Sequence, residues 1–224
     1  MKLSIIIPTL NEAAGIRNTL SNLRLQLNNE AEIIIADGGS DDQTITLARP
    51  FTDIIVQGPP GRARQMNNGA AAASGDVLLF LHADTRLPDD FVSRIEQALI
   101  PDEKVWGYFD ISLSGRRYSF RIIERMINIR TAITAIASGD QALFVSHKYF
   151  ARIGGYPEIN LMEDIAFCRC LKDLSRPARI RQPATTSSRR WQEYGVARTI
   201  LLMWYLRLAY YCGVDPDRLW RHYK

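Results

Sequence analysis

Short apolar segments alternate with helical segments through the first part of the chain, and this alternation constrains the fold more than any other feature. Four apolar runs are expected to form strands, at Lys2 to Ile7, Glu32 to Ala36, Asp53 to Gln57 and Asp76 to Leu81. Continuous apolar runs are typical of parallel strands that are covered on both faces. Alternation with helices indicates βαβ units. The sequence therefore predicts an α/β fold with a mostly parallel sheet and helices on both faces.

The expected helices follow from apolar spacing and from residues that favour helix starts. The first helix carries Ile16, Leu20, Leu23 and Leu27 at helical spacing. A second helix, over residues 41–48, is expected to be capped by Ser40, and an alanine-rich helix is expected from Gly61 to Ala73. These helices complete the alternating pattern.

The second half of the chain is less regular. Strands are expected at Val105 to Leu113 and Gln141 to Val145, and a helix that opens with two carboxylates at Met162 to Leu174. A further helix, Tyr118 to Ile136, places four apolar residues on one face, which are Ile122, Met126, Ile129 and Ile133. Gln182 to Ser188 is the nearest thing to a linker.

The length of 224 residues suits one domain with a small appendage. We assign residues 1–185 to the main domain and residues 186–224 to a basic, apolar helical extension at the C-terminal end. Three cysteines without a C-x-x-C pattern make a disulfide framework or a zinc site improbable and fit a reducing cytosol. With no secretory leader in the sequence, a cytoplasmic protein is expected.

Polar, glycine-rich or acidic residues follow each of the four N-terminal strands, at Pro8 to Glu12, Asp37 to Asp42, Gly58 to Arg62 and His82 to Asp84. In open parallel sheets, ligands bind outside the carboxyl ends of the strands. The fourth strand ends abruptly in His82 and Asp84, although an ionised carboxylate resists burial unless a charge or a metal compensates it. These strand ends therefore predict a site along one edge of the sheet.

Five segments in this order, SIIIPTLNE, IIIADGGSDD, ASGDVLLFLHADT, GGYPE and MEDIAFCRCL, resemble the family 2 glycosyltransferases of the GT-A fold. The resemblance covers Leu3 to Leu174 and is greatest to small stand-alone bacterial members. It implies a GT-A, Rossmann-like sheet with additional C-terminal helices. It also implies transfer of a hexosyl group from a UDP- or GDP-linked donor to an acceptor hydroxyl, with inversion and with a divalent metal ion, Mn²⁺ or Mg²⁺.

The Asp-x-Asp motif of that family corresponds here to His82, Ala83 and Asp84. The resemblance makes Asp84 the expected metal ligand, because hard divalent cations bind through one or two carboxylates together with substrate phosphates. His82 replaces the first aspartate of the motif. A neutral imidazole can ligate Mn²⁺ or donate a hydrogen bond to a ribose hydroxyl. The structural alternative is that His82 only caps the strand end.

The resemblance also assigns donor-binding positions, which are Pro8, Thr9, Glu12, Asp37, Gly38, Arg62, Arg64 and Asp84. Asp37 matches the position that holds the nucleobase, and Gly38 permits close approach of the ligand. The alternative for Asp37 is turn chemistry, and for Glu12 a carboxylate that serves a helix dipole. Arg62 suits a diphosphate better than Arg64, which is expected on another face of the helix.

Inverting transfer needs a carboxylate that accepts the proton of the attacking hydroxyl. The Glu163–Asp164 pair matches the Glu-Asp motif of the family, with Asp164 as the base and Glu163 in support. The alternative is that two acidic residues simply favour a helix start. Asp140, in a loop that resembles the acceptor side, is an acceptor contact, as are Arg190 and Trp191, which faintly resemble an arginine–tryptophan motif of processive relatives.

The segment from Thr199 to Gly213 is the most apolar part of the chain, interrupted by Arg207 and too short to span a bilayer. Packing on the sheet as a core helix is the favoured expectation. An interfacial helix at the inner face of a membrane, serving a lipid-linked acceptor, is the alternative. Ten basic and three acidic residues between Arg176 and Lys224 suit an anionic partner or a solvated face. A nucleic-acid partner is not expected, and the oligomeric state is left open.

Other functions remain as alternatives. A nucleotidyltransferase should carry a GxGxR-like loop after the first strand, where this chain has Pro8 to Glu12. A dinucleotide oxidoreductase should carry G-x-G-x-x-G there. A catalytically silent protein that binds a nucleotide sugar or a membrane surface would bind donor without transferring it.

Overall fold

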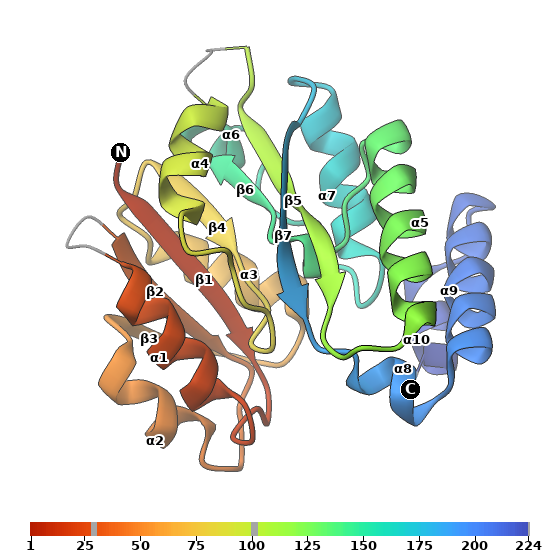
Figure 1. The fold of residues 1–224 in the computed structure, drawn as a ribbon. Helices are drawn as coiled ribbons and strands as arrows, with labels where there is room; N and C mark the ends of the chain where they lie inside the picture. Colours follow the sequence, from red (N-terminus) through yellow and green to blue (C-terminus); the bar gives the residue numbers. More distant parts are fainter. Residues whose placement is uncertain (28–30, 100–102, 224) are drawn as a thin grey trace.

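The computed structural model describes residues 1–27, 31–99 and 103–223, which are built around one seven-stranded sheet (Figure 1). Its strands are β1 (Leu3–Thr9), β2 (Ala31–Asp37), β3 (Ile54–Gln57), β4 (Val77–Phe80), β5 (Trp106–Leu113), β6 (Phe144–Ser146) and β7 (Ala178–Thr186). Their order is β3-β2-β1-β4-β6-β5-β7. Only β6 runs antiparallel to its neighbours β4 and β5 among the described strands. The predicted mostly parallel α/β sheet is confirmed.

Helices cover both faces of the sheet. They are α1 (Ile16–Gln26), α2 (Thr44–Ala48), α3 (Arg62–Ala71), α4 (Phe91–Leu99), α5 (Tyr118–Thr134), α6 (His147–Arg152), α7 (Glu163–Lys172), α8 (Arg189–Glu193), α9 (Val196–Tyr211) and α10 (Pro216–Tyr223). Side chains of β1 alternate between the faces. Ile5 and Ile7 join a core with α1 and α4, whereas Ile6 joins a core with α3 and α7.

The parallel register brings the polar strand ends together. Thr9 at the end of β1 lies beside Asp37 at the end of β2, and Asp37 lies beside Gln57 of β3. On the other side of β1, the backbone N–H of Leu81 donates to the carbonyl of Ile6 and aligns the segment that follows β4. The predicted clustering of these ends along one edge is therefore a direct result of strand pairing.

Three local predictions are wrong. Ser40 does not cap α2, which begins later at Thr44; its hydroxyl oxygen accepts instead from the N–H of Asn11, and its O–H donates to Asp37. The interval 182–188 is not a linker, since its first residues complete β7 and Thr185 pairs with Ser112 of β5. The strand expected at 141–145 begins only at Phe144, because residues 139–141 form a 3₁₀ turn with a capping box.

The helix α5 forms as predicted, but its predicted apolar face is turned to solvent. Ile122, Met126 and Ile129 are nearly half exposed, and Ile133 is 79% exposed. The opposite side packs instead, through Phe120 and Ile123. Residues 199–213 are only in part the expected core helix: Leu206 of α9 is fully buried in the core beside α7, whereas Leu201, Trp204 and Leu208 are exposed. No helix in the described ranges is long and apolar enough to cross a membrane.

Candidate functional site

A cavity of about 510 Å³ lies beyond the carboxyl ends of β1 and β4 and extends between α5 and α9. Most of the predicted site residues line it, which are Pro8, Glu12, Arg62, His82, Asp84, Asp140, Glu163, Asp164, Arg190 and Trp191. Within the described structure, four predicted residues lie outside this lining, which are Thr9, Asp37, Gly38 and Arg64. The fold therefore brings residues from both halves of the sequence into one space.

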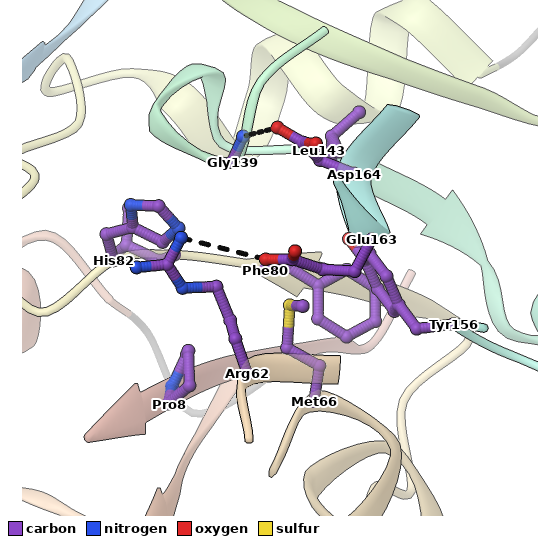
Figure 2. Close-up of a pocket in the computed structure, with 11 residues that line it drawn as sticks. Pro8, Arg62, Met66, Phe80, His82, Gly139, Leu143, Tyr156, Glu163 and Asp164 are labelled. Atoms are coloured by element: carbon purple, nitrogen blue, oxygen red, sulfur yellow. Dashed lines mark hydrogen bonds and ion pairs between the residues drawn. The ribbon is translucent and has the colours of Figure 1, made fainter. Parts of the chain in front are cut away.

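A small recess adjoins the cavity and shares part of its lining, and in it Arg62 and Glu163 face each other (Figure 2). Each is the first residue of its helix, α3 and α7, and Arg62 Nη1 lies 3.6 Å from Glu163 Oε1. Glu163 is only 5% exposed. Its burial raises the pKa of the carboxyl, Arg62 opposes that rise, and the negative charge of Asp164 adds to it. Glu163 therefore holds its proton more tightly than a solvated glutamate.

Asp164 lies at the boundary between the recess and the larger cavity and lines both. Its Oδ2 accepts a hydrogen bond of 3.3 Å from the N–H of Gly139, as Figure 2 shows, and its Oδ1 accepts one of 2.7 Å from Ile165. Met162, directly before α7, has a left-handed backbone with φ of 67°. A left-handed conformation is strained for a residue with a side chain and is concentrated at functional sites. These contacts hold Asp164 at the cavity wall.

His82 makes its contacts on the side of the 138–141 turn. Its Nδ1 lies 2.9 Å from Asp140 Oδ1. Its Nε2 is buried without a hydrogen-bond partner among the described residues, and a Cβ added at Gly139 would come within 2.4 Å of it. Burial raises the pKa of Asp140, but the hydrogen bond and charge of His82 outweigh it and lower the pKa. This geometry fits both alternatives, because a carboxylate on Nδ1 can fix a strand-end histidine and also leaves Nε2 as the nitrogen that could meet a ligand.

Asp84 is exposed in the cavity and lies near Glu12. Burial raises the pKa of Glu12, and the charge of Asp84 raises it further. No three His, Cys, Asp or Glu side chains in the described ranges are grouped to hold a metal ion. Asp84 therefore fits a hard divalent cation only if a ligand such as a diphosphate supplies further oxygens, which is how Mg²⁺ commonly binds.

Asp37 is buried, and its carboxylate is held by the loop that follows β2. It accepts four hydrogen bonds from described residues: Oδ1 from the hydroxyls of Thr9 and Ser40, and Oδ2 from the N–H groups of Gly39 and Ser40. Burial raises its pKa, but these bonds outweigh it, so the pKa is lowered. Four bonds use the acceptor capacity of a carboxylate. A nucleobase would have to replace one of them.

Gly38 and Arg64 have structural surroundings that explain them without a ligand. A Cβ at Gly38 would lie 3.0 Å from the side chain of Gln65, which ties β1 to β2 by donating to the carbonyls of Thr9 and Ala36. Arg64 Nε lies 3.4 Å from Glu158 Oε2, away from the cavity lining. Gln65 belongs to no recognised motif, so its role in joining β1 to β2 could not be predicted from the sequence.

Sequence reasoning also missed a group of basic residues on the far wall of the cavity. Arg130 of α5 and Arg207 of α9 line it, and burial together with the charge of Arg207 lowers the pKa of Arg130 to about 10. Tyr223 covers Arg190, whose Cζ lies 4.0 Å from the ring centroid. The only available signal was Arg207, which interrupts an otherwise apolar segment.

A mostly parallel sheet ends in a cavity lined by carboxylates and arginines, and comparison with known proteins identifies the class of this protein as a glycosyltransferase. The sequence profile of Glycosyl transferase family 2 matches residues 4–165. The chain belongs to this family. Its resemblance to family 2 is thereby confirmed.

Relatives share the family over much of the chain. A PGL/p-HBAD biosynthesis glycosyltransferase of Mycobacterium bovis is 30% identical over 165 residues, which cover 68% of this chain and 62% of that protein. The probable glycosyltransferase YdaM of Bacillus subtilis is 30% identical over 146 residues, which cover 58% of this chain and 34% of that protein. The match thus spans about three-fifths of the mycobacterial relative.

Solved glycosyltransferases share the GT-A fold. Residues 1–349 of S. aureus TarS superpose with a TM-score of 0.68 at 19% identity, covering 84% of this chain and 61% of that one. The mannosyltransferase PcManGT from Pyrobaculum calidifontis, in complex with GDP-Man and Mn²⁺, superposes with a TM-score of 0.67 at 20% identity, covering 93% and 61%. The fold predicted from the sequence is confirmed.

Proposed function

We propose that the protein transfers a hexosyl group from a UDP- or GDP-linked donor to an acceptor hydroxyl, with inversion at the anomeric carbon. One observation carries this proposal: Glu163 and Asp164, at the start of α7, share a cavity with Asp84, which follows β4. Solved relatives in complex with UDP-GlcNAc or with GDP-Man and Mn²⁺ support a nucleotide-sugar donor and a divalent ion.

Each residue then has a defined part in the reaction. Asp164 accepts the proton of the acceptor hydroxyl while the hydroxyl oxygen attacks the anomeric carbon, and the nucleoside diphosphate leaves with the electrons of the broken bond. Arg62 stabilises the charge of the leaving diphosphate, and Arg190 contacts the acceptor. Glu163 supports Asp164 or contacts the acceptor. A divalent ion held by Asp84 supplies Lewis-acid stabilisation of the same diphosphate when bound.

The C-terminal helices suit an acceptor that is carried on a lipid. On α9, Leu201, Trp204 and Leu208 are each more than half exposed. Aromatic residues with flanking arginines are typical of helices at the membrane surface. We infer that the acceptor reaches the cavity from this side, where Trp204 and Arg207 line it.

Calorimetric titration with a panel of nucleoside diphosphates, with and without Mn²⁺, tests the donor site. Metal-dependent binding of one nucleotide by the wild type, lost in Asp84→Ala, is the expected result and identifies the base of the donor. Asp89→Ala is the matched control, because Asp89 is a largely exposed aspartate of the segment after β4 and lies outside the cavity lining of the described residues. Absence of nucleotide binding by the wild type under every condition would overturn the proposal.

Glycosyl transfer is tested separately, with a labelled sugar nucleotide and cell extracts that supply candidate acceptors. Wild-type transfer that disappears in Asp164→Asn, while nucleotide binding persists, supports the assigned base. Nucleotide binding without hydrolysis or transfer in the wild type would instead favour the catalytically silent alternative.

A further inference from the structure

Two helices expose continuous apolar stripes that the fold leaves without a partner. These stripes, named here the apolar faces of α5 and α9, consist of Ile122, Met126, Ile129 and Ile133 on α5 and of Leu201, Trp204, Tyr205 and Leu208 on α9. Their exposed fractions range from 45% to 79%. A helix of a globular domain normally turns such a stripe to the core. Large exposed apolar surfaces indicate docking sites.

The two helices belong to one unit of the structure. Ile127 of α5 packs with Ile200 of α9 around Phe120 and Ile123, and α5 and α9 lie on the same side of the sheet in Figure 1. Met126 and Trp204 are exposed and also line the cavity that contains Asp164. The cavity therefore reaches the surface between the apolar faces of α5 and α9.

The segments that carry these faces are strongly basic, and four of their arginines line the cavity between the faces. Residues 116–134 and 189–211 contain nine arginines, at positions 116, 117, 121, 125, 130, 189, 190, 198 and 207. Their acidic residues are Glu124 and Glu193. Glu124 is buried and accepts a hydrogen bond from the backbone N–H of Leu113. Its negative charge therefore does little to neutralise the arginines at the surface. An apolar surface bordered by arginines is complementary to anionic lipid head groups above acyl chains.

A second copy of the chain is a weaker match for this surface. A symmetric dimer places the same patch of both subunits in contact. Arginines on the border of one patch would then face arginines on the border of the other. An anionic membrane removes that repulsion, and Trp204 and Tyr205 suit the interface between head groups and acyl chains.

We propose that the apolar faces of α5 and α9 dock together on an anionic bilayer surface, and that the acceptor enters the cavity from the lipid between Met126 and Trp204. Docking stands independently of the reaction, whereas acceptor entry rests on the proposed glycosyl transfer. The docking surface therefore includes the apolar face of α5 as well as that of α9.

Cosedimentation with vesicles tests the docking. The wild type is expected to bind vesicles of equimolar phosphatidylcholine and phosphatidylglycerol, and to bind phosphatidylcholine vesicles much more weakly. The double substitution Ile129→Glu and Leu208→Glu should weaken binding at least tenfold. Leu25→Glu is the matched control, because Leu25 is an apolar residue of α1 that is 86% exposed. Equal binding by the double variant and the control would overturn the proposal.

Tryptophan quenching by brominated lipids gives a second measurement that does not depend on a destabilising substitution. Quenching of wild-type fluorescence that falls sharply in Trp204→Phe is expected. Quenching that is absent in the wild type, or self-association that the double substitution abolishes in the absence of lipid, would overturn the proposal in favour of a dimer.

Nucleoside diphosphate titration separates failure of this proposal from failure of the proposed function. The double variant should bind nucleotide as the wild type does and unfold at the same temperature, because both substituted side chains are exposed. Wild-type vesicle binding without nucleotide binding would overturn glycosyl transfer and leave the docking intact.

Discussion

The helices α1 and α5 carry similar apolar patterns and use them in opposite ways. On α1, Ile16 and Leu20 are fully buried against the sheet. On α5, Ile129 is 48% exposed and Ile133 is 79% exposed. The spacing of apolar residues thus predicts a helix in both cases but does not tell which stripe meets the core. On α1 the stripe holds the fold together, and on α5 it borders the cavity.

The largest expected effect is at Asp164 of α7, which lines the same cavity as Met126 of α5. Asp164→Asn removes the carboxylate that accepts the proton, so kcat should fall by about 10²–10⁴-fold. Donor binding should change little and thermal stability should fall only slightly, because an asparagine keeps an oxygen that accepts from Ile165 and loses only the longer bond from Gly139. Asp173→Asn, at the far end of α7, is the control. Comparable rates for Asp164→Asn and the control would remove Asp164 from the mechanism.

Paired alanine substitutions test the comparison of the two helices directly. Leu20→Ala opens a cavity in the core and should lower the free energy of unfolding by about 2–5 kcal/mol. Ile129→Ala removes a half-exposed side chain and should change it by about 0.5 kcal/mol or less. Urea denaturation of both variants measures the difference. Equal destabilisation would show that the apolar face of α5 is buried in solution.

A smaller effect is expected at Asp37, whose carboxylate links Thr9 of β1 to the loop after β2. Asp37→Asn cannot accept all four hydrogen bonds and should destabilise the protein by about 1–3 kcal/mol at neutral pH. Denaturation at neutral pH is the measurement. An unchanged midpoint would mean that the loop does not depend on this carboxylate.

The pH dependence of that effect has a defined sign. The native pKa of Asp37 lies below its ordinary value of 3.8, so its stabilisation is complete above that value and is lost as the pH falls through the native pKa. The difference in unfolding free energy between the wild type and Asp37→Asn should therefore shrink below about pH 4. A difference that grows on acidification would contradict the hydrogen-bonding account.

The sequence predicted the sheet and the gathering of its polar ends because both depend on local pattern and strand pairing. Asp84 and Asp164 converge because one follows β4 and the other opens α7, beside the same sheet edge. Strand ends of a parallel sheet meet whatever their separation in the chain. The position of Asp84 therefore needed no knowledge of side-chain packing, whereas Asp164 was predicted from its match to the Glu-Asp motif of the family.

Other features depend on contacts that no local pattern encodes. Arg130 and Arg207 meet across the cavity only because α5 and α9 pack together. Ser40 matches the helix-cap preference, but its hydroxyl oxygen accepts from the N–H of Asn11 and its O–H donates to Asp37, so neighbours outside the helix decide its role. His82 Nδ1 meets Asp140 only because the 138–141 turn packs against the end of β4. Such choices are settled by tertiary neighbours.

The ion pair between Arg62 and Glu163 links the binding of a diphosphate to the protonation of Glu163. A bound diphosphate brings negative charge next to Arg62, and the positive charge that favours ionised Glu163 is then shared. The pKa of Glu163, already raised by burial, should rise further, and the protein should take up a proton as it binds. Donor affinity should then weaken as the pH increases, and binding heats should differ between buffers of different ionisation enthalpy. Binding of a diphosphate in the cavity would thus be coupled to uptake of a proton at Glu163.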